Sequence, residues 1–130
     1  MKLRLTREAF DSLRAEAAAS PDEECCGLLL GHGAVEETRS AVNVAPDRKR
    51  HFEIDPQALV DAHRAAREGG LAVIGYYHSH PSGPAAPSAT DRALAAGDGS
   101  VWAIVNAHDV TFWRDDRGGF APLPYTVEDR

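Results

Sequence analysis

The segment from Leu71 to Pro81 constrains the fold of this chain more than any other. Residues 71–77 are apolar, aromatic and β-branched, which predicts a β-strand. A His-Ser-His-Pro sequence follows directly at residues 78–81. Because side chains alternate between the two faces of a strand, His78 and His80 point to the same face. The sequence therefore predicts two imidazoles that converge at the C-terminal end of one strand.

A carboxylate follows the two histidines after a loop rich in Pro and Gly. This loop, residues 82–87, leads to Ser88-Ala89-Thr90-Asp91. Two imidazole nitrogens and one carboxylate oxygen suit Zn²⁺, and three protein ligands leave a fourth position for water, as in catalytic sites. Ser88 and Asp91 also predict a helix N-terminus, with Ser88 as the N-cap. The two interpretations are compatible, because a helix start holds both side chains in a fixed position.

Two glutamates are candidates for the base that such a site needs. A metal-activated water must give its proton to a nearby group. Glu23 and Glu24 both precede the apolar segment 25–30, and strand alternation places them on opposite faces. The residues alone leave both open, together with the interpretation that either is a solvated strand end. Ser88 is a candidate donor to the oxyanion of a tetrahedral intermediate.

The pattern of the remaining segments predicts a mixed α/β fold with helices placed between strands. We expect a helix from Thr6 to about Ala19, and another that begins at Asp55-Pro56 and ends at Gly69-Gly70. His63 is expected on the inner face of the second helix. A third helix is expected from Ser88 to Ala96. Strands are expected at residues 3–5, 24–30, 35–44, 51–54, 71–80, 101–106, 109–114 and 120–127.

Charge and cysteine content narrow the class of protein. The 130 residues fit one domain, and a net charge of −6 without a basic block disfavours nucleic-acid binding. No apolar run approaches the roughly 20 residues of a membrane span, and the first residues contain no apolar signal region. The only cysteines, Cys25 and Cys26, are neighbours, which rarely form a disulfide. A reducing, cytoplasmic location is therefore expected.

Three segments together resemble the JAMM (MPN-plus, Mov34/JAB) zinc metallopeptidase family, in its short prokaryotic type. They are Glu24–Gly31, Gly75–Pro81 and Pro87–Asp91, and ten residues separate His80 from Asp91, as in the family motif. The family glutamate precedes the glycine of the apolar strand by three residues, which selects Glu24 over Glu23. Residues 43–56 are similar to the segment before the family's middle helix, so the resemblance covers nearly the whole chain.

The resemblance implies a fold, a site and a cofactor. The fold is the cytidine-deaminase-like α/β arrangement of three layers, a mixed central sheet flanked by helices, in a single JAMM/MPN-plus domain over residues 1–130. His78, His80 and Asp91 would bind one Zn²⁺ per chain. Glu24 would be the general base and acid, and Ser88 would stabilise the oxyanion.

The implied reaction is hydrolysis of the bond after the C-terminal Gly-Gly of a ubiquitin-like or sulfur-carrier protein. The chain lacks the insertions of larger family members. One alternative is a non-catalytic MPN-type binding or scaffold module, which loss of Glu24 or of a ligand would have indicated. Another is a different zinc hydrolase or a deaminase. A deaminase would need a Pro-Cys-x-x-Cys sequence, which is absent because Cys25 and Cys26 are adjacent.

Overall fold

A six-stranded mixed sheet forms the centre of the protein in the computed structural model, which describes residues 2–129. The strand order is β3-β2-β4-β5-β6-β7; β4 and β5 are parallel, and every other neighbouring pair is antiparallel. A separate parallel pair joins β1 to β8. The strands are β1 Leu3–Thr6, β2 Cys26–Gly31, β3 Glu37–Ala41, β4 Ala72–Ser79, β5 Val101–Val105, β6 Val110–Asp116, β7 Gly119–Pro122 and β8 Tyr125–Glu128. The helices are α1 Arg7–Ala19, α2 Pro56–Arg67 and α3 Ala89–Leu94.

The three helices begin at the residues whose side chains predict a cap. Thr6 accepts a hydrogen bond from the Ala9 backbone N–H at 3.1 Å, and Asp55 accepts one from Gln57 at 3.1 Å. Ser88 caps α3 in the same manner. No helix in the described part of the chain, residues 2–129, has the length and apolarity that a membrane crossing needs.

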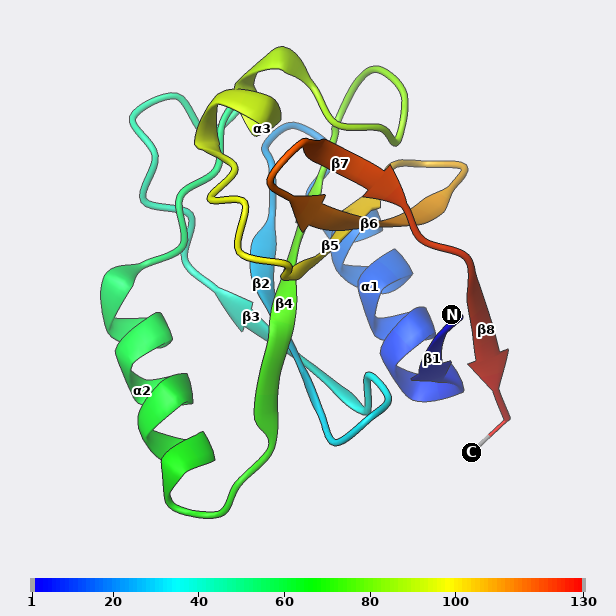
Figure 1. The fold of residues 1–130 in the computed structure, drawn as a ribbon. Coiled ribbons are helices and arrows are strands. Elements are labelled where there is room, and N and C mark those ends of the chain that lie inside the picture. The colour runs from blue at the N-terminus through cyan, green and yellow to red at the C-terminus, as the bar shows by residue number, and fades with distance from the viewer. Residues whose placement is uncertain (1, 130) are drawn as a thin grey trace.

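Helices cover both faces of the central sheet. Alternate residues of β2 pack to opposite sides: Leu29 joins the cluster that contains Leu13 of α1, whereas Leu28 joins the cluster that contains Ala62 of α2. Figure 1 shows α1 and α2 on opposite sides of β2 and β4, with α3 above the upper end of β4. The predicted mixed sheet flanked by helices is therefore confirmed.

Several expected elements differ from the structure in extent; α3, for example, ends at Leu94 rather than Ala96. β2 begins at Cys26 rather than Glu24. The strand expected over 35–44 is shortened to β3, because Val35 turns away to pair with Leu5 of β1 instead. Of residues 51–54, only Ile54 forms a bridge, with Asn43. The strand expected over 120–127 is two strands, β7 and β8, which belong to different sheets.

His63, expected on the inner face of α2, is exposed, because the inner face is formed by Ala62 and its apolar neighbours.

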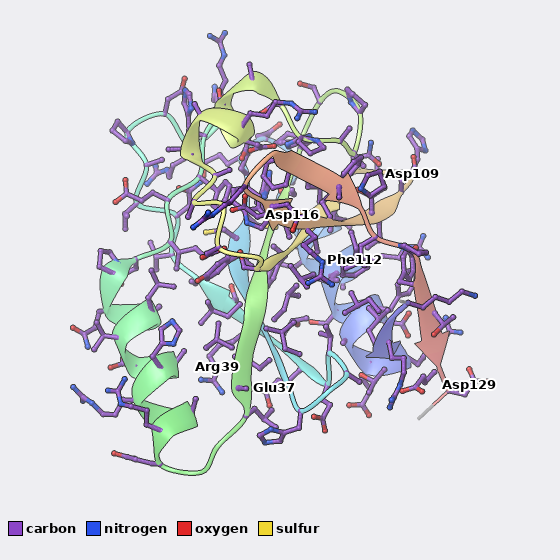
Figure 2. All side chains as sticks on the ribbon, viewed as in Figure 1. Glu37, Arg39, Asp109, Phe112, Asp116 and Asp129 are labelled. Carbon is purple, nitrogen blue, oxygen red and sulfur yellow. The ribbon has the colours of Figure 1, made fainter. Side chains whose placement is uncertain are left out.

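The edge strand β3 carries charged side chains, and Arg39 Nη2 lies 2.9 Å from Glu37 Oε2 (Figure 2). Charges on an edge strand disfavour pairing with another chain.

Candidate metal centre

The two histidines lie at the C-terminal end of β4, as their spacing predicts. His78 is flanked in register by Cys26 of β2 and Ile104 of β5. His80 directly follows the strand, and its backbone N–H donates to the Val105 carbonyl at 2.8 Å. The extended backbone therefore continues through His80, and the two Nε2 atoms lie 3.2 Å apart.

Helix α3 brings Asp91 to the two histidines. Ser88 Oγ accepts the Asp91 backbone N–H at 3.0 Å, and Asp91 Oδ2 accepts the Ser88 backbone N–H at 3.0 Å, so the two residues form a capping box. Asp91 Oδ1 lies 3.1 Å from His78 Nε2, and Oδ2 lies 3.1 Å from His80 Nε2. The helix start therefore orients the carboxylate toward both imidazoles.

These donor atoms form a set that fits a zinc ion. Within the described residues, His78, His80 and Asp91 are a group whose ligand atoms all lie within 4.8 Å of one another, and all three residues are buried. Ligands at about 2.0–2.1 Å from a tetrahedral zinc are separated by about 3.3 Å, close to the spacings of 3.1–3.2 Å in the structure. The three donor atoms are therefore spaced as ligands of one ion would be.

Different contacts hold the two rings. His80 Nδ1 lies 2.8 Å from the Pro84 carbonyl oxygen, which only accepts, so Nδ1 carries the proton and Nε2 has a free lone pair. The His78 ring stacks on Phe52, with centroids 4.2 Å apart, and meets the Trp102 ring edge-on. His78 Nδ1 is buried and has no hydrogen-bond partner within residues 2–129, so aromatic packing orients this ring.

Burial and the Asp91 charge determine how these groups titrate without a metal. Burial lowers the pKa of His78. Burial also acts to lower the pKa of His80, but the hydrogen bonds to Asp91 and Pro84 outweigh it and the pKa is raised. For Asp91, burial is opposed by the hydrogen bonds from both histidines, which hold the pKa of this carboxyl well below its usual value. Asp91 is therefore the anionic ligand of the group.

Glu24 lies beside this group and Glu23 does not. Cys26 of β2 pairs with His78 of the antiparallel strand β4. If this register is continued two residues beyond the pair, Glu24 lies opposite His80. The Glu24 side chain is 7% exposed, and its Oε1 has no hydrogen-bond partner in the described range. Burial raises the pKa of Glu24 to about 7, with a smaller opposing effect of His80. Glu23 instead pairs with Arg48 at 3.4 Å on the surface.

Asn43 holds the backbone on which Glu24 stands. Its Nδ2 donates to the carbonyl oxygens of Glu24 and His51, both at 2.9 Å. Its Oδ1 accepts the backbone N–H groups of Ala45 and Glu53, both at 3.0 Å. Sequence reasoning gave Asn43 no role, because these bonds go to backbone atoms whose positions depend on the loop conformation.

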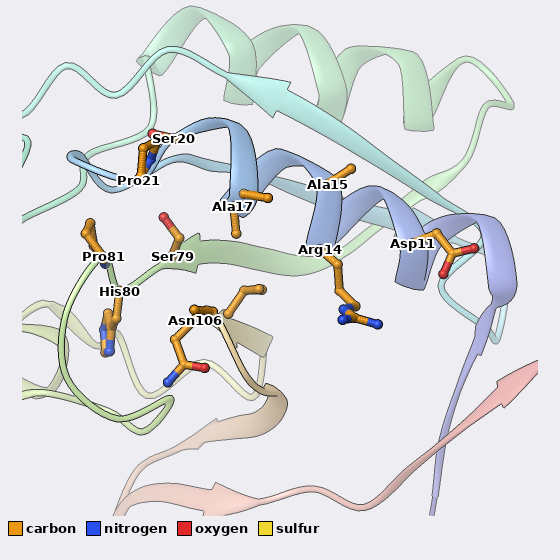
Figure 3. Close-up of a pocket in the computed structure, with 13 residues that line it drawn as sticks. Asp11, Arg14, Ala15, Ala17, Ser20, Pro21, Ser79, His80, Pro81 and Asn106 are labelled. Carbon is orange, nitrogen blue, oxygen red and sulfur yellow. The ribbon is translucent and has the colours of Figure 1, made fainter.

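A cleft beside His80 adjoins two further hollows. A cleft of about 320 Å³ is lined by Glu24, His80 and Ser88, so the candidate base and oxyanion donor share one space. A groove of about 900 Å³ is mainly apolar and runs between the 45–54 segment and α3. A third hollow, of about 490 Å³, lies between α1 and the end of β5, and His80 and Asn106 border it (Figure 3).

Comparison with known proteins agrees with this geometry. The family model for prokaryotic homologues of the JAB domain matches residues 6–116. The chain belongs to this family. The match runs from the start of α1 to the end of β6, so it includes all three candidate ligands of the JAB site. The resemblance to the JAMM family, in its short prokaryotic type, is thereby confirmed.

Two curated relatives of this JAB-family chain carry functional names. It is 34% identical to the desampylase of Haloferax volcanii over 98% of this chain and 97% of that protein. It is 36% identical to the probable TtuB-protein conjugate cleaving protease of Thermus thermophilus, over 68% of this chain and 60% of that protein. Both sequence identities exceed 30%, and the first similarity spans nearly the whole chain.

Solved structures share the fold of this JAB-family chain. The solution structure of a protein from Desulfitobacterium hafniense has a TM-score of 0.87 at 26% identity, over 98% of this chain and 94% of that one. A JAB1/MPN domain protein from Archaeoglobus fulgidus has a TM-score of 0.61 at 19% identity, over 96% and 97% of the two chains. The second likeness concerns the fold alone.

The structure therefore brings together every residue that the sequence singled out for the JAB site. His78, His80 and Asp91 converge, Glu24 lies beside them, and Ser88 shares the cleft. Sequence reasoning missed two supporting contacts besides Asn43. The aromatic neighbour Phe52 could have been suspected from its place in the 43–56 segment. The Pro84 carbonyl could not, because a backbone acceptor has no sequence signal.

Proposed function

We propose that this chain is a zinc-dependent peptidase or isopeptidase that hydrolyses the bond after the C-terminal Gly-Gly of a ubiquitin-like or sulfur-carrier protein. One observation carries the proposal: His78, His80 and Asp91 converge within 4.8 Å, and the buried Glu24 lines the same cleft as His80. The relatives named desampylase and TtuB-protein conjugate cleaving protease support the kind of substrate.

His78, His80 and Asp91 would hold one zinc ion per chain. Three ligands leave one position open, which is the coordination of catalytic rather than structural sites. The ion would supply Lewis acidity, which lowers the pKa of water and polarises a carbonyl group. Asp91 provides the one negative charge of the ligand set, and the bond from His80 to Pro84 keeps the required tautomer.

Glu24 is suited to move the proton. In the metal-free protein burial raises the pKa of this carboxyl, and a carboxyl perturbed in this direction can both accept and return a proton. The water oxygen adds to the carbonyl carbon of the scissile bond, and Glu24 takes the proton that the water loses. Glu24 then gives this proton to the leaving nitrogen as the C–N bond breaks. The acid and the free amine are the products.

Ser88 is suited to stabilise the oxyanion. Its Oγ already accepts the Asp91 backbone N–H at 3.0 Å, and its hydroxyl proton remains available for donation. Because the capping box fixes this side chain before substrate arrives, the donor needs no reorganisation during the reaction.

A Gly-Gly tail fits a site of this kind for steric reasons. Glycine has no side chain, so an extended tail can pass close to the ligands, and backbone hydrogen bonds to a strand edge can hold its register. Residues 1–130 would form a single JAMM/MPN-plus domain. The cytoplasmic location expected from the cysteine content stays a prediction.

Mass spectrometry of a carrier extended beyond Gly-Gly by one amino acid or a short peptide tests the proposal. The zinc-loaded protein should release the extension, and replacing the last two glycines by bulky residues should block release. Glu24→Gln is the matched inactive control, because it preserves the shape of the side chain. Intact carrier after long incubation, across several host carriers, would favour the alternative of a non-catalytic MPN-type binding module.

A further inference from the structure

The loop between His80 and Ser88 is held in place by side chains. Among the residues that the structure describes, no hydrogen bond between two backbone groups involves this loop, residues 82–87. Two of its residues are prolines, which have no backbone N–H to donate. The path of the loop therefore depends on side chains that reach its carbonyl groups.

Three consecutive carbonyl groups of the loop, those of residues 83–85, each accept a hydrogen bond from a different side chain. Asn106 Nδ2 donates to the first at 3.2 Å, His80 Nδ1 to the second at 2.8 Å, and Thr111 Oγ1 to the third at 2.7 Å. Figure 3 shows the Asn106 side chain directed toward this loop. Asn106 follows β5 and Thr111 lies on β6, so these two strands hold the loop on both sides of the bond to His80.

The two donors outside the metal centre are themselves fixed. Thr111 has one hydroxyl proton, and its Oγ1 lies closer to the Ala85 carbonyl than to the Ile104 carbonyl, at 2.7 Å against 3.4 Å. The same Oγ1 accepts the Trp113 Nε1–H at 2.9 Å. Asn106 Oδ1 accepts two backbone N–H groups of the β5–β6 turn, at 2.9 and 2.7 Å. Both side chains are thus oriented before they reach the loop.

We infer that Thr111 is a positioning residue for the metal centre and that Asn106 assists it. By fixing the carbonyl groups before and after that of Pro84, they place the acceptor that orients the His80 ring and keeps its proton on Nδ1. His80 Nε2 then stays free to bind the metal. The loop is in this respect a fixed support of the ligand rather than a lid. The inference rests on the metal site of the proposed function.

Thr111→Val tests the inference, because it replaces only the hydroxyl by a methyl group. Zinc affinity is measured by competition with a chelating dye, in protein shown to be folded by circular dichroism. Loss of one hydrogen bond predicts about three- to tenfold weaker zinc binding. Thr111→Ser keeps the hydroxyl and should restore the affinity of the wild type.

A spectroscopic measurement separates positioning of the ring from a general loss of stability. In the zinc-loaded protein, the NMR signal of the His80 Nδ1 proton should be present in the wild type and in Thr111→Ser. It should be lost through exchange with water in Thr111→Val, because the Pro84 carbonyl is then no longer held against the ring.

Thr38→Val is the matched control. Thr38 is also a partly buried residue of a strand, and its hydroxyl forms a hydrogen bond with Ser12 at 2.8 Å. This variant should leave zinc affinity unchanged. Asn106→Ser gives a measurement that does not depend on the folding of Thr111→Val. Serine can still accept from the β5–β6 turn but is too short to reach the loop, and about two- to threefold weaker zinc binding is expected.

Three results would overturn the inference. They are unchanged zinc affinity in both Thr111→Val and Asn106→Ser, a loss in Thr111→Val that Thr111→Ser shares, and an equal loss in Thr38→Val. A wild-type protein that binds no zinc would instead overturn the proposed function, and the inference with it.

Discussion

The buried carboxyl of Glu24 should make the metal-free protein less stable as the pH rises. Its pKa is about 7 in the folded protein, against 4.5 when the side chain is solvated. Between these values the folded state holds a proton that the unfolded state has lost, so the free energy of unfolding falls with increasing pH. The difference in pKa corresponds to at most about 3 kcal/mol, reached above pH 7.

Glu24→Gln removes this pH dependence, because an amide does not ionise. The variant should therefore gain about 2–3 kcal/mol relative to the wild type between pH 5 and pH 8. Urea unfolding in the presence of a chelator measures the gain at both pH values, and a change of this size moves the midpoint by about 1 M. Glu23→Gln is the matched control, since Glu23 is half-exposed and its ion pair is worth about 1 kcal/mol or less.

Two results would refute this reasoning. The first is a stability difference between Glu24→Gln and the wild type that is the same at pH 5 and pH 8, since burial would then not govern the titration. The second is an equal pH-dependent gain in Glu23→Gln, since the effect would then follow from net charge rather than from the buried position of Glu24.

Three further outcomes are expected from substitutions at the candidate site. His80→Ala should abolish stoichiometric zinc in a protein that remains folded, as metal analysis would measure; unchanged zinc content would exclude His80 as a ligand. Glu24→Gln should retain zinc but lower kcat by about 10²–10⁴-fold in the peptidase assay. Glu23→Gln should leave kcat unchanged. A loss of kcat in Glu23→Gln but not in Glu24→Gln would mean that the assignment of the base is wrong. Ser88→Ala should lower kcat by about 10²–10³-fold. Thr6→Ala removes the cap of α1 at a similar cost in stability and should leave kcat unchanged. Equal activity loss in both cap variants would assign Ser88 a structural role alone.

Features that depend on a few neighbouring residues were predicted well. The alternation of a strand places His78 and His80 on one face, and a capping side chain marks each helix start, as at Thr6 and Asp55. These signals are local because the interacting groups lie within four residues of one another. The place of Asp91 in the first turn of α3 could be predicted for the same reason, whereas its approach to the histidines spans 11 residues or more and was expected from the family motif.

Features that depend on distant partners were predicted poorly. Val35 leaves its expected strand because Leu5 offers a partner across the fold, and residues 120–127 divide because β8 pairs with β1. Periodicity contains no information on such pairings. The hydrogen bonds of Asn43 are missed for a related reason, because they connect segments that only the folded loop brings together.

The pairing of β1 with β8 has a mechanical consequence. The two strands are parallel, with Leu3 beside Tyr125 and Thr6 beside Glu128. A force that pulls the two ends of the described chain apart draws these strands in opposite directions along their common axis. All of their hydrogen bonds are then sheared together, rather than opened one after another as in a zipper. The chain should therefore resist extension from its ends until this pair ruptures as a unit, and the central sheet that contains His78 should bear no load before then.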